Sequence, residues 1–325
     1  MKKFINKKFS WVVTGGAGFI GSNLIKHLLK NNQKVICIDN LSTGKKDNII
    51  EFLRNKNFKF VKHDIRNKFK YKIKCNFFVH LAALGSVPKS FKYPIETNDV
   101  NVSGSLNMYE LSIKSGAKKF IFASSSSVYG NSKNKIKKEN DPLNPISPYG
   151  LSKYIFEKYL NQIDSLNNIQ CYGLRFFNVF GPYQNEFGPY APVISKWIRN
   201  GLNKKQLELY GDGKAIRDFT YVDNVVSAII NLCLINKKST NLKLFNIGTA
   251  NPINLEKVYQ KIKKILMKYN IRIKMVKKKP RNGDIKISSS DISLAKSYFK
   301  CLRFLRSSAI FWSPSCNIFI ISSIF

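Results

Sequence analysis

A tyrosine and a lysine, Tyr149 and Lys153, stand four residues apart in the segment SPYGLSK, at the start of an expected helix. That spacing places both side chains on one face of a helix. A tyrosine with its free pKa near ~10 is a poor base, but a nearby ammonium and a cationic cofactor ring both favour the phenolate. Tyr149 can then exchange a proton with a substrate hydroxyl at neutral pH. Because Tyr-x-x-x-Lys is common by chance, the pair needs support from the surrounding sequence.

Four consecutive serines, Ser124 to Ser127, follow the apolar segment KKFIFA about 24 residues upstream of Tyr149. A serine run is usually a flexible linker, but here it follows β-branched and aromatic residues and precedes Val-Tyr-Gly. This context predicts the carboxyl end of a buried strand. The run supplies hydroxyl groups and no carboxylate.

A glycine array, GGAGFIG, places Gly15, Gly18 and Gly21 directly after an apolar strand and at the start of a helix. The first glycine permits a tight turn, the second lets the backbone approach a pyrophosphate, and the third lets helix and strand pack closely. The helix N-terminus presents free N–H groups and its positive dipole end to phosphates. The array therefore predicts a dinucleotide site.

An acidic residue, Asp39, ends the second predicted strand about twenty residues after the glycines. A carboxylate there accepts hydrogen bonds from both adenosine ribose hydroxyls and repels a 2′-phosphate, which favours NAD over NADP. Asn40, Ser42 and Gly44 follow in a turn that can wrap the ribose. Asp64 ends the third strand, where it can reach the adenine edge; the alternative is a helix cap.

The elements that position these residues alternate between strands and helices. Apolar strand segments include WVVT, KVICID, KFVKHDI, CNFFVHLAAL and KKFIFASSSS, with helical patterns such as SGSLNMYELSIKSGA between them. This order predicts a Rossmann-like, doubly wound parallel α/β sheet covered on both faces. We expect a cofactor domain at 8–178 with a return segment at 219–250, and a smaller, loop-rich substrate domain formed by 179–218 and 251–300.

The composition is strongly basic, with 55 Lys+Arg against 19 Asp+Glu and a formal net charge of +36 at pH 7. The lysines are spread along the whole chain, so we favour a composition bias over a nucleic-acid partner. Six separated cysteines and three histidines show no metal-ligand spacing, and no apolar segment of signal length opens the chain, so we expect no metal and a cytoplasmic location. Residues 301–325 lack the lysine-rich composition of the rest of the chain, and the segment 309–325 has no charged residue. We interpret them as an atypical, non-native tail. They are short for a membrane span.

From Trp11 to Ser297 the chain resembles the nucleotide-sugar epimerases of the extended short-chain dehydrogenase/reductase family. The motifs that carry the resemblance are TGGAGFIG, DNLSTG, HLAALGSVPKS, SSSSVYG, SPYGLSK, LRFFNVFGP, GDGKAIRDFTYVDN and PRNGD. Two of these segments, AALGSVPKS and SPYGLSKY, look most like the subgroup that acts on UDP-N-acetylglucosamine and its galacto epimer. The family tends to form homodimers through paired helices, here those around 103–114 and 149–161.

The resemblance implies a mechanism in which Tyr149 takes the proton from the hydroxyl at sugar carbon 4 while a hydride leaves that carbon for NAD. The 4-keto sugar turns over in the site, and hydride and proton return to its other face. Lys153 would hold the nicotinamide ribose and tune Tyr149. Ser125 would steady the carbon 4 oxygen, with Ser126 as a neighbouring substrate contact; we prefer Ser125 for the first role.

The remaining expected site residues also come from the family motifs. The cofactor site further includes Phe19, Ile20, Ile65, Leu81, Ala82, Ala83 and Phe177. The substrate site includes Gly85, Ser86, Asn178, Arg217, Arg281, Asp284 and Ser288, with the two arginines gripping the diphosphate as bidentate donors. Ser288 stands where epimerases restricted to unacetylated sugars tend to have a tyrosine, so an N-acetyl group has room. Lys286 and Ile287 depart from the Arg-His that the subgroup often has there.

Several alternatives stay open on the sequence alone. One is an epimerase for UDP-glucose and UDP-galactose or for a UDP-uronate. A second is a nucleotide-sugar dehydratase or decarboxylase, although such enzymes place a carboxylate within the serine motif, and this chain has Ser125, Ser126 and Ser127 there. A third is a binding protein that kept the fold and lost the chemistry.

Overall fold

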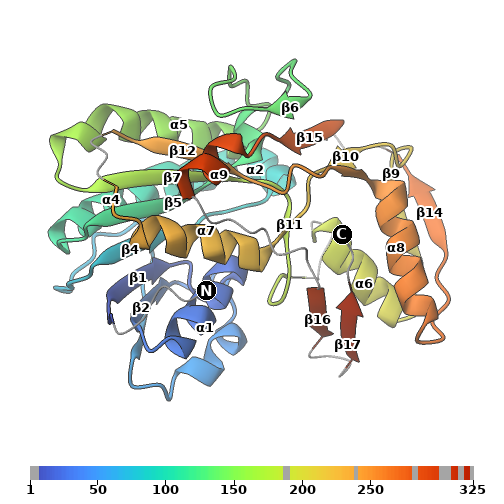
Figure 1. Ribbon diagram of the computed structural model, residues 1–325, viewed down its shortest axis with the longest axis horizontal. Helices are drawn as coiled ribbons and strands as arrows, with labels where there is room; N and C mark the ends of the chain where they lie inside the picture. The colour runs from blue at the N-terminus through green and yellow to red at the C-terminus, as the bar shows by residue number, and fades with distance from the viewer. Residues whose placement is uncertain are drawn as a thin grey trace.

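A central sheet of seven parallel strands forms the body of the protein in this computed structural model (Figure 1). The structure describes residues 7–185, 191–237, 241–279, 285–299, 309–313 and 318–322, the last two ranges as backbone alone. In spatial order the strands are β12 (Lys243–Ile247), β7 (Gln170–Phe176), β5 (Lys119–Ser125), β4 (Phe77–His80), β1 (Ser10–Thr14), β2 (Lys34–Asp39) and β3 (Phe58–Lys62). The predicted doubly wound sheet is confirmed, and the segment NLKLFNIGTA returns to it as β12.

Helices cover both faces of the sheet because its strands are apolar on both sides. In β1, Trp11 and Val13 pack with one layer of helices, whereas Val12 packs with the other. The first layer holds α1 (Phe19–Lys30), α7 (Val222–Leu234) and α9 (Ser293–Phe299), and the second holds α4 (Gly104–Lys114) and α5 (Pro148–Ile163). Figure 1 shows α5 at the upper end of the sheet, α1 near the bottom and α7 at mid-height between them.

A smaller body lies beside the carboxyl-end loops of the sheet, at the right of Figure 1, with its own apolar cluster around Trp197, Leu209 and Ile262. Its elements are α6 (Val193–Leu202), β9 (Leu207–Tyr210), α8 (Leu255–Met267) and β14 (Met275–Lys278). A four-stranded sheet joins β13 (Ile253–Asn254), β10 (Ile216–Arg217), β15 (Ile287–Ser290) and β6 (Ile136–Lys137). The residue bounds expected for the two domains stay a prediction.

Shorter elements complete the described chain. The helices α2 (Val87–Lys92) and α3 (Pro94–Asn98) lead through a π-helical turn at Asp99–Ser103 into α4, and β8 (Val179–Phe180) pairs with β11 (Thr220–Tyr221). Single turns lie at Lys46–Asn48, Ile50–Phe52, Ser126–Val128 and Asp164–Leu166. The atypical tail contains an antiparallel pair, β16 (Ala309–Ser313) and β17 (Ile318–Ser322). Among the described residues, no helix has the length and apolar character needed to cross a membrane.

Candidate functional site

The turn between β1 and α1 is built around glycines that no other residue can replace without a clash. Gly15 has a φ of +67°, in the left-handed region that favours glycine, and a Cβ on it would lie 2.6 Å from the backbone nitrogen of Ala82. A Cβ on Gly21 would lie 2.3 Å from the carbonyl oxygen of Gly15. No described side chain caps the start of α1 at Gly18, so the helix presents its N-terminal N–H groups to the crevice. This cradle fits a pyrophosphate.

Asp39 lies buried at the end of β2, with its carboxylate held by two backbone N–H groups. Its Oδ2 accepts from the N–H of Ala17 at 3.0 Å and its Oδ1 accepts from the N–H of Leu41 at 2.8 Å. Burial raises the pKa of Asp39, and these hydrogen bonds oppose that rise. Gly44 packs behind it, since a Cβ there would lie 3.0 Å from Oδ2. The carboxylate is therefore fixed where a ribose would lie.

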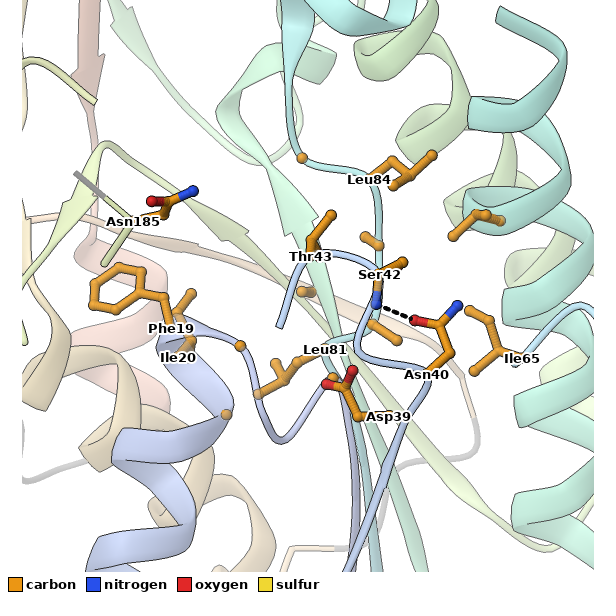
Figure 2. A pocket seen from close by; sticks show the side chains of 18 of the residues that line it. Phe19, Ile20, Asp39, Asn40, Ser42, Thr43, Ile65, Leu81, Leu84 and Asn185 are labelled. Atoms are coloured by element: carbon orange, nitrogen blue, oxygen red, sulfur yellow. Dashed lines mark hydrogen bonds between the residues drawn. The ribbon is translucent and has the colours of Figure 1, made fainter. Parts of the chain in front are cut away.

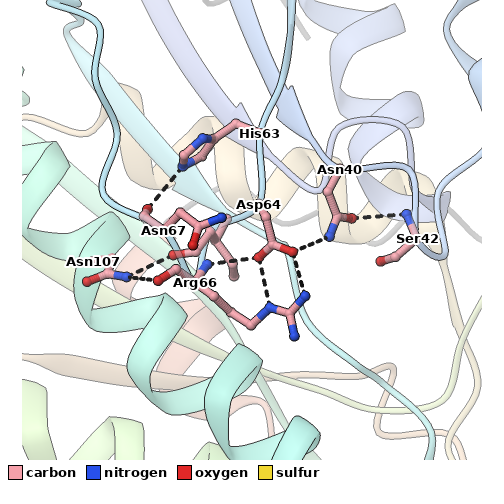
Figure 3. Close-up of polar contacts among 8 residues, drawn as sticks. Asn40, Ser42, His63, Asp64, Arg66, Asn67 and Asn107 are labelled. Atoms are coloured by element: carbon pink, nitrogen blue, oxygen red, sulfur yellow. Dashed lines mark hydrogen bonds and ion pairs between the residues drawn. The ribbon is translucent and has the colours of Figure 1, made fainter.

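Asp64 is locked by Arg66 and Asn40 (Figure 3). Arg66 donates from Nε and Nη2 to the two carboxylate oxygens, at 3.0 and 2.7 Å, and Asn40 donates from Nδ2 at 3.0 Å. The guanidinium holds the pKa of Asp64 well below its usual range. Asp64 accepts from the N–H of Arg66 in a turn and caps no helix. The contact with adenine stays a prediction.

A cavity of about 380 Å³ opens above these residues (Figure 2), which is within the range of small-molecule sites. The structure brings to its wall the predicted residues Gly15, Gly18, Phe19, Ile20, Gly21, Asp39, Asn40, Ser42, Asp64, Ile65, Leu81, Ala82, Ala83 and Gly85. These come from the loops after β1, β2, β3 and β4, which end at one edge of the sheet. Since β1 and β4 are neighbours from which the chain proceeds in opposite directions, the cavity lies at the topological switch point, where open α/β sheets bind ligands.

Sequence reasoning missed other residues of the cavity wall, among them Thr43, Lys45, Asn48, Arg66, Leu84, Tyr183, Gln184 and Asn185. Thr43 and Arg66 follow strand ends within the predicted turns, and that position could have identified them. Tyr183 and Asn185 belong to a loop beyond β8 that reaches the cavity because Asn23 donates to the carbonyl oxygen of Pro182 at 2.9 Å. Asn23 and Pro182 are 159 residues apart, so no local sequence pattern predicts their contact.

The start of α5 brings the predicted base to the serine strand end. Ser147 accepts from the N–H of Gly150 at 3.1 Å and Pro148 follows at the first helical position, so the helix begins there. The Ser125 side chain lies near enough to Tyr149 to oppose the rise in the pKa of Tyr149 that burial causes. Tyr149 and Ser125 therefore lie together, as the assignment of Ser125 requires.

Lys153 is 4% exposed and donates from Nζ to the carbonyl oxygen of Ala123 at 2.9 Å. Burial lowers the pKa of Lys153 to about 8, and Glu157 on the next helical turn opposes that effect. Ala123 itself lines the cavity. The ammonium thus lies beside a residue of the cavity wall, on the same helical face as Tyr149, although Lys153 itself does not line the cavity.

The cavity wall does not include Gly44, Ser125, Tyr149 and Lys153, nor does it include three further predicted residues. Phe177 is fully buried in a cluster with Val128 and Tyr129. Ser86 caps α2 by accepting from the N–H of Lys89 at 3.4 Å. Ser126 is half-buried and begins the turn after β5. Their contacts with ligands stay predictions.

The predicted substrate residues Asn178, Arg217 and Ser288 meet near β10 and β15. Asn178 donates from Nδ2 to the carbonyl oxygen of Asp218 at 3.0 Å and to Ser288 Oγ at 3.4 Å. Arg217 pairs in register with Ser288 and donates to the carbonyl oxygen of Ile216 at 2.9 Å. Arg281 and Asp284 lie outside the described residues.

The buried carboxylate of Asp218 holds this cluster together. Its Oδ1 accepts from the N–H and hydroxyl of Thr249, and its Oδ2 accepts from the N–H of Ala250 and from the N–H and hydroxyl of Ser290. Asp218 is 0% exposed. The strand that carries Ser288 is therefore fixed to the loop that follows β12.

Comparison with known proteins agrees with this geometry. The sequence model of the NAD dependent epimerase/dehydratase family matches residues 11–248. A Methanocaldococcus jannaschii protein, whose name gives UDP-glucose 4-epimerase as a provisional activity, is 39% identical over 292 residues, which are 88% of this chain and 91% of that protein.

Two solved structures share the fold over most of both chains. One is a UDP-N-acetylglucosamine 4-epimerase from Methanobrevibacter ruminantium in complex with UDP-N-acetylmuramic acid, at 36% identity and a TM-score of 0.80, covering 89% of this chain and 91% of that one. The other is a UDP-glucose 4-epimerase from Thermotoga maritima with UDP-glucose, at 35% identity and a TM-score of 0.79, with the same coverage. The glycine cradle, the uncapped helix and Asp39 fit the cofactor named in the family description. This chain is an enzyme of the NAD dependent epimerase/dehydratase family, with NAD as its cofactor.

Proposed function

We propose that this enzyme is a UDP-hexose 4-epimerase and that its substrates are UDP-N-acetylglucosamine and UDP-N-acetylgalactosamine. The single observation that carries the reaction type is the contact between Tyr149 and Ser125 at a strand end where positions 125, 126 and 127 are all serine. At that end, Tyr149 of α5 supplies the base and Ser125 of β5 supplies the hydroxyl. Elimination or decarboxylation needs an acid at this point.

The residues have separate roles in this reaction. Tyr149 removes the proton from the hydroxyl at sugar carbon 4 and later returns it, while Ser125 hydrogen-bonds to the same oxygen. Lys153 favours the phenolate form of Tyr149 through its positive charge. In this site NAD would supply the reversible hydride acceptor that the chemistry at carbon 4 needs. The site returns to its starting state after each turnover, because the cofactor is regenerated.

The substrate assignment is supported by the small side chain of Ser288. It is buried beside Asn178 and Arg217 at the edge of β15, so a bulkier residue there would fill the space that an N-acetyl group needs. The relatives do not separate the substrates, since epimerases named for acetylated and unacetylated sugars match this chain almost equally. A UDP-glucose/UDP-galactose or UDP-uronate epimerase is the alternative within the same chemistry.

An equilibrium assay with four UDP-sugars tests this proposal. The purified enzyme is incubated separately with UDP-glucose, UDP-galactose, UDP-N-acetylglucosamine and UDP-N-acetylgalactosamine, and the products are separated by chromatography. We expect interconversion of the acetylated pair. Turnover of the unacetylated pair alone would contradict the substrate assignment, and a persistent keto sugar would contradict the reaction type.

We further propose that the protein is a homodimer whose interface includes α5, one of the two helices expected there, together with α2 and α3 in place of α4. Exposed apolar side chains gather on α2, α3 and α5, including Phe91, Ile95 and Leu151, which are 52%, 77% and 46% exposed. Phe91 and Leu151 also line one surface groove, so a second copy could bury this face. Sedimentation should show Ile95→Lys to be monomeric and the equally exposed control Leu166→Lys, also 77% exposed, to be dimeric. Two dimeric variants would contradict this face as the interface.

A further inference from the structure

A buried network of polar side chains lies beneath the helix that carries Lys153. Glu157, one turn further along α5, accepts from Ser124 Oγ at 2.5 Å and from Nε and Nη2 of Arg175 at 3.0 and 2.8 Å. Ser124 and Arg175 are partners in register on β5 and β7. The exposed fractions of Ser124, Glu157 and Arg175 are 2%, 3% and 2%. The carboxylate therefore joins α5 to two central strands at once.

The network continues through Tyr129 to Asn246 on β12. Arg175 donates from Nη1 to the hydroxyl of Tyr129 at 2.8 Å, and that hydroxyl donates to Asn246 Oδ1 at 2.7 Å. The guanidinium carbon of Arg175 also lies 4.9 Å from the centre of the Tyr129 ring, a cation–π contact. The Tyr129 hydroxyl is thus the link between the ion pair and Asn246.

Asn246 connects this chain of contacts to the strands of the substrate side. Its Nδ2 donates to the carbonyl oxygens of Lys137 at 2.9 Å and Asp291 at 3.1 Å. Lys137 pairs in register with Ser290 on β15, the strand that also carries Ser288. One end of the network therefore fixes the helix of Lys153, and the other end fixes the strand of Ser288.

Stability alone is a weak explanation for such an arrangement. Replacing a buried ion pair by well-packed apolar residues is often neutral or stabilising, because desolvation of the two charges offsets their attraction. A fully satisfied polar network instead specifies one geometry. Glu157 has an electrostatic effect as well, since its carboxylate favours the ammonium form of Lys153.

We propose that Glu157, Arg175, Tyr129 and Asn246 are positioning residues that hold the catalytic helix and the sugar-binding strand at a fixed separation. The proposal rests on the proposed function, because it assumes that Lys153 and Ser288 belong to one reaction site. These four residues act through Lys153, Tyr149 and Ser288 and do not contact the reacting atoms.

The sharpest variant is Tyr129→Phe, which removes the linking hydroxyl and keeps the ring and the Glu157–Arg175 pair. The matched control is Tyr172→Phe on β7. Tyr172 is 0% exposed and Tyr129 is 1% exposed, and the Tyr172 hydroxyl contacts that of Tyr298 at 3.4 Å, outside the network. Amide hydrogen exchange is measured on the full-length protein without cofactor or sugar. We expect Tyr129→Phe to raise exchange on the order of tenfold in both 148–157 and 287–290, a loss of about 1.4 kcal/mol. The control should change neither segment.

Turnover provides the second readout. This readout requires that the wild-type enzyme epimerises its substrate and retains NAD. Tyr129→Phe should then lower kcat about tenfold and leave the amount of bound NAD unchanged. Tyr172→Phe should keep kcat within about twofold of the wild-type value. Equal effects of the two variants on exchange, or loosening of one segment without the other, would overturn the network. A normal kcat in Tyr129→Phe would overturn its catalytic role. The proposed function fails separately, if wild-type enzyme turns over no UDP-sugar, because hydrogen exchange still tests the network in that case.

Discussion

Lys153 donates a 2.9 Å hydrogen bond to the carbonyl oxygen of Ala123, two residues before Ser125 on the same strand. This contact fastens the first turns of α5 to the carboxyl end of β5. It leaves Tyr149, one turn earlier on the helix, against the Ser125 hydroxyl. The two segments that the proposed reaction needs are thus held together by Lys153, the residue proposed to supply the positive charge.

The pH dependence of turnover should follow Lys153. Burial lowers its pKa to about 8, so the ammonium is lost as the pH rises through that value, and the Tyr149 phenolate loses its neighbouring charge. We expect kcat to decline above pH ~8. In Lys153→Arg the side chain stays charged at all these pH values, so kcat should not decline above pH ~8. The absolute rate of this variant will be lower than that of the wild type. A wild-type rate that keeps rising to pH ~10 would contradict this role.

Acid sensitivity of the fold should depend on His80. Its ring is 2% exposed, lies 2.7 Å from Thr14 Oγ1 and 2.9 Å from Ser105 Oγ, and burial lowers its pKa to about 3. Between that value and the unfolded pKa of about 6.5, only the unfolded chain binds this proton, so stability falls as the pH drops below 6.5.

The variant His80→Gln keeps polar atoms near Thr14 and Ser105 and removes the titration. As the pH drops from 6.5 to 5, we expect the free energy of unfolding to fall by about 2 kcal/mol less in His80→Gln than in the wild type. Denaturant unfolding at the two pH values measures this difference. Equal losses in both proteins would show that His80 is not the responsible group.

Cofactor binding should be lost when a methyl group is added at Gly21. Its Cβ would lie 2.3 Å from the Gly15 carbonyl oxygen and 2.6 Å from Gly16 Cα, so the turn between β1 and α1 must shift. We expect Gly21→Ala to weaken NAD binding by at least about tenfold, measured by calorimetry. Lys30→Ala, at the exposed end of α1, is the control and should bind normally. Normal binding by both variants would argue against the cradle.

Selection of NAD over NADP should depend on Asp39. Its fixed carboxylate would repel a 2′-phosphate, and the cationic side chains of Lys45 and Arg66 line the same cavity. Asp39→Ser should therefore narrow the affinity difference between NAD and NADP by about tenfold or more, as measured by cofactor titration. An unchanged ratio would mean that another group makes the selection.

The size of residue 288 should decide which sugars are accepted. Ser288→Tyr adds a ring at a buried position beside Asn178, so we expect it to abolish turnover of the acetylated pair. Ser288→Ala is the matched control and should retain turnover of the acetylated pair. If Ser288→Tyr had the same kcat/KM for acetylated sugars as the wild type, the N-acetyl group would bind elsewhere.

Local patterns predicted those parts of the fold and site that depend on neighbouring residues. The glycine turn, Asp39 at a strand end and the Tyr149–Lys153 spacing each follow from a short segment, and apolar strands between helices predicted the parallel sheet. The fold and the cofactor were confirmed, whereas the residue roles and domain bounds stay predictions.

Features that depend on distant pairing left no such signal. The ion pair between Glu157 and Arg175 joins a helix to a strand, and nothing near either residue predicts the partner. The same holds for Tyr183, which reaches the cavity at the switch point from the loop after β8. The burial of Phe177 against Tyr129 was likewise not expected, because a motif gives a position along the chain and not the direction of a side chain.

The most direct test of the central claim follows a deuterium label at carbon 4 of UDP-N-acetylglucosamine. The account predicts UDP-N-acetylgalactosamine that retains the label at carbon 4, because the hydride is removed and returned within one closed site. It also predicts no product with Tyr149→Phe, which keeps its NAD. Loss of the label to solvent, release of carbon dioxide, or substantial turnover by Tyr149→Phe would contradict it.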